Sequence, residues 1–135
     1  MIDFTSLAYR DWIKNPPATS DSVLRAEVSL GQKLPDDYKE FLAWSNGGEG
    51  KIKSGYLSLW SVEKLEKLNA DYEIGKWLPN FFGIGTDGGS LCFGFYPHTK
   101  AALNICSVPL GDLCFESVSR KAESFSRFLE QEFPL

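Results

Sequence analysis

The hydrophobic pattern of this chain changes its period near residue 48, and this change limits the folds that it can adopt. Before that point apolar residues recur at the three- and four-residue spacing of amphipathic helices. From residue 51 to residue 118 they mostly alternate along short segments separated by turns, and a helical pattern returns near the C-terminus. This order predicts an α+β fold, an antiparallel β-sheet with flanking helices, because a parallel sheet needs alternating strands and helices. The 135 residues suit one domain spanning 1–135.

Three helices are predicted in the first part of the chain, and residues that favour helix ends mark where they stop. Asn15-Pro16-Pro17 stops the first, Gly31 ends the second and Asn46-Gly47-Gly48 ends the third. The predicted helices cover residues 4–12, about 20–30 with Ser20 or Asp21 as the cap, and about 35–45 with an inner face of Tyr38, Phe41, Leu42 and Ser45. Asp36 and Asp37 fit the start of the third helix.

One acid in this region has a predicted structural role. Glu27 lies on a largely apolar helical face between Val23 and Leu30. We expect its carboxylate to accept hydrogen bonds from the backbone of the following loop.

The second part of the chain reads as strands with two helical segments. Turn residues such as Ser54-Gly55 and Asp87-Gly88 separate the strands. We predict a hairpin over 51–60, followed by a short helix over 61–68 capped by Ser61. An irregular segment over 69–79 follows, with Tyr72, Ile74, Trp77 and Leu78 packed inward. We then predict strands over 81–85, 91–96, 103–108 and 113–118, a turn over 97–100, and a last helix over 120–132 with Phe125, Phe128 and Leu129 in the core.

The sequence contains one match to a nucleotide-binding motif, and its context argues against that function. Gly83-Ile84-Gly85-Thr86-Asp87-Gly88 fits GxGxxG, but a dinucleotide site needs a helix directly after the glycines. The following segment, 91–95, reads as a strand. A tight hairpin is therefore the favoured interpretation.

No residue combination predicts catalysis or metal binding. His98 is the only histidine and falls in a predicted turn, where an exposed imidazole is expected. Cys92, Cys106 and Cys114 lie in apolar segments without zinc-ligand spacing, so we expect buried free thiols. The acid pairs, such as Asp71 with Glu73 and Asp112 with Glu116, fit solvated turns. We therefore expect no enzyme activity, no cofactor and no metal.

Charge and hydropathy bear on partners and compartment. The net charge is −4, with 14 basic and 18 acidic residues and no basic stripe, which disfavours direct binding of nucleic acid. The N-terminal residues lack a signal-peptide pattern, and no segment has the about 20 apolar residues of a membrane span. The odd cysteine count favours a reducing compartment. We expect a cytoplasmic protein that does not bind membranes.

Several motifs, in order, resemble those of the SMI1/KNR4 family, also called the SUKH superfamily. The resemblance covers about residues 20–132. Its motifs are Glu27-Val28-Ser29-Leu30-Gly31-Gln32-Lys33-Leu34-Pro35-Asp36-Asp37-Tyr38-Lys39-Glu40-Phe41-Leu42 with Asn46-Gly47-Gly48, Leu57-Ser58-Leu59-Trp60, Asn69 to Tyr72, Phe82 to Gly89, and Ala122 to Leu129. Ser90 departs from the family's usual glycine.

This resemblance implies an antiparallel α+β fold and a function in protein binding. Bacterial members of the family resemble immunity proteins that neutralise polymorphic toxins, often nucleases, whereas fungal relatives are regulatory interaction proteins. We therefore expect an immunity protein whose partner is a cognate toxin, with a basic nuclease domain as one such partner. A regulatory scaffold is the alternative, and small-molecule binding or hydrolysis is a third. The candidate partner-binding residues are Glu49, Asp71, Tyr72 and Asp87, all in predicted loops.

Overall fold

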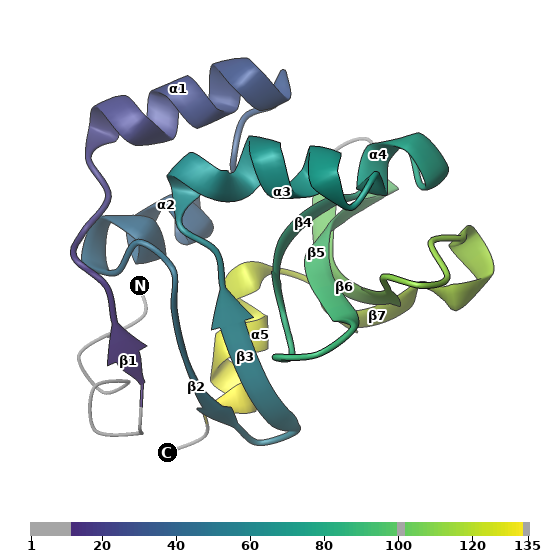
Figure 1. The fold of residues 1–135 in the computed structure, drawn as a ribbon. Helices are drawn as coiled ribbons and strands as arrows, with labels where there is room; N and C mark the ends of the chain where they lie inside the picture. The colour runs from purple at the N-terminus through teal and green to yellow at the C-terminus, as the bar shows by residue number, and fades with distance from the viewer. Residues whose placement is uncertain (1–11, 100–101, 134–135) are drawn as a thin grey trace.

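The computed structural model describes residues 12–99 and 102–133, which form an antiparallel sheet with helices packed on it (Figure 1). Within these residues the sheet has seven strands whose order in space follows the chain from β1 to β7. The strands are β1 (Ile13–Lys14), β2 (Gly48–Ile52), β3 (Gly55–Leu59), β4 (Phe82–Thr86), β5 (Leu91–Thr99), β6 (Ala102–Pro109) and β7 (Ser119–Ala122). The predicted α+β class is confirmed.

The helices of the described residues fall into three groups along the chain. Two precede β2, namely α1 (Ser20–Leu30) and α2 (Asp36–Trp44). Between β3 and β4 lie the 3₁₀ turn η2 (Val62–Lys64), α3 (Leu65–Asp71) and α4 (Ile74–Trp77). A second 3₁₀ turn, η3 (Phe115–Ser117), precedes β7, and α5 (Phe125–Glu132) follows it.

The sheet separates two hydrophobic clusters. The larger cluster includes the inner faces of α2 and α5, with Phe41 and Phe125 fully buried beside Phe95 of β5. The smaller cluster joins Ile74 and Leu78, from the α4 region, to Cys92 of β5. Neighbouring residues of β5 thus face opposite sides, as the alternation of a strand requires.

The α2–α5 contact is fixed by a side chain as well as by apolar packing. The Asp37 carboxylate accepts hydrogen bonds from the backbone N–H and the hydroxyl of Ser126, both at 2.8 Å. Ser126 is in the first turn of α5, where an N–H has no partner within the helix. Asp37 thus lies at the start of α2, as predicted, and also joins α2 to α5, which was not predicted.

Tyr38 is buried at the centre of the larger cluster, and its hydroxyl has no hydrogen-bond partner within the described part of the chain. Its ring packs edge-on against Phe95 and Phe125, with centroids 5.3 and 5.1 Å away. Burial raises the pKa of the hydroxyl, because an ionised phenolate would be desolvated there.

We therefore expect Tyr38→Phe to keep or raise the free energy of unfolding, by up to about 1 kcal/mol, because it removes an unpaired buried polar group and keeps the ring. Urea denaturation measures this change. A loss above about 1 kcal/mol would show that the hydroxyl has a partner after all.

Three of the predicted helix ends and turns are confirmed. Gly31 has the left-handed conformation at the end of α1 (φ 66°), and α2 ends at Trp44 before the Asn-Gly-Gly turn. Gly88 has a positive φ in the β4–β5 turn, so the GxGxxG match is a hairpin as expected. The cap of α1 is Thr19, not Ser20 or Asp21: its side chain accepts the N–H of Ser22.

Two smaller predictions in the first half are also wrong. Gly55 already belongs to β3, so the hairpin turns one residue earlier, at Lys53–Ser54. Ser61 precedes a 3₁₀ turn and makes no capping bond with its side chain. The predicted helix over 4–12 lies outside the described residues, apart from Trp12.

The C-terminal part differs from prediction in two segments. Residues 113–118 form no strand: they contain the 3₁₀ turn η3, and the Ser117 hydroxyl donates a hydrogen bond back to the Asp112 carboxylate. The strand is instead the polar β7, and the last helix begins only at Phe125, where the Ser124 side chain caps it. β5 continues to Thr99 through the predicted turn, and Lys100 lies outside the described residues.

The segment 69–79 is more regular than predicted. α3 continues to Asp71 and α4 follows after a two-residue break. Ile74 and Leu78 are buried as expected, one helical turn apart. Tyr72 and Trp77 are 44% and 60% exposed, so the prediction that they pack inward is wrong.

Candidate partner-binding groove

An open groove of about 610 Å³ lies between the α3–α4 region and the loop after β6. We call it the α4 groove. In Figure 1, α4 and the β6–β7 connection are on the same side of the molecule. The lining residues are Asp71, Tyr72, Glu73 and Trp77 from the first wall and Leu110, Gly111, Asp112 and Leu113 from the second.

Aromatic side chains are exposed at and beside the α4 groove. Tyr72 stacks on the half-buried Trp60 with an interplanar angle of 12° and a centroid distance of 6.0 Å. Trp77 lies on the outer side of α4, since Ile74 and Leu78 occupy its inner side. Phe115, two residues beyond Leu113, is 68% exposed. Exposed Trp and Tyr rings are typical anchors of protein interfaces.

The lining of the α4 groove is acidic, with three carboxylates and no basic residue. Basic side chains reach two of these acids from outside the lining: Lys67 is 2.6 Å from Asp71, and Lys76 is 3.2 Å from Glu73. Asp112 accepts a hydrogen bond from Ser117, which is the main reason that the pKa of its carboxyl is lowered.

Glu73 has an unusual backbone conformation for a non-glycine residue, with φ 57°. It precedes α4, and its carboxylate accepts the indole N–H of Trp77 at 3.2 Å. A left-handed residue of this type carries strain that the surrounding structure must hold. Glu73, Trp77 and Asp112 were missed as site residues, although the Ile74/Leu78 spacing indicates a helical turn with Trp77 on its other side.

The structure does not bring the four candidate residues into one site. Asp71 and Tyr72 both line the α4 groove. Glu49 is in strand β2 and Asp71 is in α3, so the prediction that both lie in loops is wrong. Glu49 is exposed, and its carboxylate accepts a hydrogen bond from the Tyr56 hydroxyl on β3. Asp87 and Tyr56 line a separate depression of about 270 Å³ near α5. Asp87 also accepts the N–H groups of Gly89 and Leu91, so it organises the β4–β5 turn.

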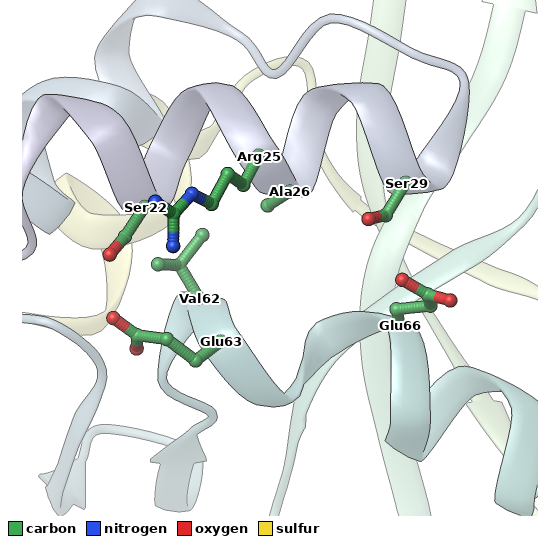
Figure 2. Close-up of a pocket in the computed structure, with 7 residues that line it drawn as sticks. All are labelled: Ser22, Arg25, Ala26, Ser29, Val62, Glu63 and Glu66. Atoms are coloured by element: carbon green, nitrogen blue, oxygen red, sulfur yellow. The ribbon is translucent and has the colours of Figure 1, made fainter.

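A third depression lies between α1 and the η2–α3 segment (Figure 2). Arg25 extends from α1 toward Val62, and Glu63 and Glu66 lie opposite on η2 and α3. Its volume of about 190 Å³ is below the about 300 Å³ typical of the smallest ligand pockets. We interpret it as a packing gap beneath α1, where Ser22, Ala26 and Ser29 are small.

The cysteines and His98 were the candidates for catalysis or metal binding. Cys92 and Cys106 are buried free thiols, and burial raises the pKa of Cys92 to about 12. Cys114 is a free thiol but only half-buried. His98 belongs to β5 rather than to a turn, and its side chain lies outside the described part. Within that part no three metal-binding side chains converge.

Comparison with known families adds to these observations. A sequence model of the SMI1 / KNR4 family (SUKH-1) matches residues 17–131, which is most of the chain. The chain belongs to the SMI1/KNR4 family (SUKH-1). A search of curated proteins gives no match. At the level of the family, this membership supports a protein-binding, immunity-type domain.

The Asn-Gly-Gly turn of this SMI1/KNR4 chain has a structural role. The Asn46 side chain accepts the N–H of Val62 at 2.7 Å and donates to Glu63 at 2.7 Å, which joins the turn to η2. Gly47 has φ 83°, and a Cβ there would lie 2.6 Å from the Leu59 carbonyl oxygen. This motif therefore positions the segment that leads into α3.

Two other family-like motifs also build the scaffold. The Asn69 amide bonds both backbone groups of Gly83, at 2.7 and 3.0 Å, and so fixes α3 to β4 beside the groove. Glu27 accepts the N–H of Leu34 at 2.8 Å, which confirms its predicted role. Asn46, Gly47, Glu27 and Asn69 do not line the α4 groove, whereas Asp71 and Tyr72, at the end of the Asn69 to Tyr72 motif, do. No helix in residues 12–99 and 102–133 has the length and apolar character that crossing a membrane requires.

Proposed function

We propose that this chain is an immunity protein that binds and neutralises a cognate bacterial toxin, and that the α4 groove is its binding surface. The observation that carries this proposal is the groove's exposed Trp77 and Tyr72 beside three carboxylates. Aromatic anchors provide buried area at an interface, and complementary charge speeds encounter and selects the partner. A nuclease toxin with a basic surface suits such a groove.

The mechanism that we propose needs no chemical step in this chain. The bound immunity protein would cover or distort the toxin's active site, in the cytoplasm, with residues 1–135 acting as one binding domain. The acidic net charge of −4 supports a protein target rather than direct contact with nucleic acid or membrane. Glu49 and Asp87, near Tyr56, are proposed as secondary contacts only.

The test is co-expression with the toxin encoded beside the gene. We expect the cells to survive and a complex of the two proteins to co-purify. Death at the same rate with and without this chain, together with no complex, would contradict the immunity function. Purification of several housekeeping proteins and no toxin would instead support a regulatory scaffold.

A further inference from the structure

We propose that Glu73 and Trp77 form a subsite for an arginine side chain of the partner, and that Lys76 occupies this subsite in the free protein. The inference rests on the proposed function, because it names the partner chemistry that the α4 groove recognises. The occupant is an arginine followed by an apolar residue on the surface of a partner protein.

The geometry around Trp77 is that of a cation site. The Lys76 ammonium lies 5.0 Å from the centroid of the Trp77 ring and 3.2 Å from the Glu73 carboxylate. The indole N–H donates to the same carboxylate at 3.2 Å, so ring and acid are held together. An aromatic face beside a carboxylate binds a cation by two independent attractions.

Lys76 is held weakly enough to be displaced. Its side chain is 64% exposed and that of Glu73 is 52% exposed, so water screens their attraction. Lysine also makes poor use of the ring, because its ammonium is a compact, strongly hydrated charge. A guanidinium is flat and less hydrated, so it stacks on an indole while its N–H groups donate to a carboxylate.

The opposite wall of the α4 groove fits the rest of the occupant. Leu110 and Leu113 are half-buried there and provide an apolar contact, while Asp112 adds a third carboxylate. An arginine next to an apolar residue would pair with Glu73 and Trp77 on one wall and with these leucines on the other. Displaced Lys76 would then be free to turn toward solvent.

The experiment uses the isolated protein and a defined probe. N-acetyl-arginine amide is titrated while the indole ¹H–¹⁵N resonance of Trp77 is followed by NMR, with N-acetyl-citrulline amide as the neutral probe of the same shape. We expect a saturable shift with the arginine probe only. Lys76→Met should tighten binding about three- to fivefold, since it removes the competing cation. Glu73→Gln should weaken it by at least that factor.

Lys67→Met is the matched control, because it also removes one positive charge beside the groove but none over the Trp77 ring. An equal shift with citrulline, no shift, or equal tightening by Lys67→Met and Lys76→Met would overturn the subsite. The proposed function is judged separately. A toxin complex that Glu73→Gln leaves unchanged rejects the subsite alone, whereas specific arginine binding without any toxin complex rejects the immunity function alone.

Discussion

An Asn69→Leu variant is expected to lose about 3–5 kcal/mol of the free energy of unfolding. The Asn69 amide accepts the Gly83 N–H at 2.7 Å and donates to the Gly83 and Leu65 carbonyls at 3.0 and 2.7 Å. Gly83 lies in β4 and is buried. Leucine has a similar size but leaves both backbone groups of Gly83 unpaired, and each such group costs about 1–3 kcal/mol.

Chemical denaturation followed by tryptophan fluorescence measures this loss. Ala70→Ser is the matched control, because Ala70 is the next residue of α3 and is exposed. We expect this control to stay within about 0.5 kcal/mol of the parent. If Asn69→Leu were equally stable, the attachment of α3 to β4 through this amide would be wrong.

The second large effect is expected for Gly94→Ala, with a loss of about 3 kcal/mol or more. Gly94 is on β5 opposite Gly83 of β4. A Cβ at Gly94 would lie 2.3 Å from the Phe82 carbonyl oxygen and 2.6 Å from the ring of Phe81. Backbone is the nearest obstacle, so the strands must separate to admit even one methyl group.

Gly75→Ala provides the opposite result as a control. Gly75 is within α4, and a Cβ there would meet nothing within 4 Å. Alanine in a helix is favoured over glycine by about 0.5–1 kcal/mol, so stability should rise. Thermal melts of both variants measure the two changes in stability. If Gly94→Ala were as stable as Gly75→Ala, β4 and β5 would not approach each other as closely at Gly94 as the structure shows.

The local features of the fold were predictable wherever a residue's own chemistry determines the backbone. The left-handed Gly31, the start of α2 at Asp36 and the turn at Gly88 follow from such preferences. β7 was not predictable, because Ser119, Arg120 and Lys121 are exposed on a sheet edge and show no apolar alternation. Its pairing with β6 depends on tertiary context.

The site was only partly predictable for a related reason. Asp71 and Tyr72 were identified as loop residues rich in interface chemistry, and they do line the α4 groove. Asp112 comes to the same groove from a position about 40 residues later in the chain, and nothing local in the sequence indicates this. Trp77 was predicted to pack inward, but Ile74 and Leu78 occupy the buried side of α4 and leave Trp77 exposed on the other side.

The most direct test of the central claim is the affinity of Trp77→Ala for the cognate toxin, measured by calorimetry. The control is Leu24→Ala, because Leu24 is 59% exposed on α1 and does not line the α4 groove. Both variants should keep the parent's stability, since both side chains are exposed. We expect Trp77→Ala to bind at least about 30-fold more weakly, as for an interface anchor, and Leu24→Ala to bind like the parent. Unchanged affinity of Trp77→Ala would contradict the α4 groove as the binding surface.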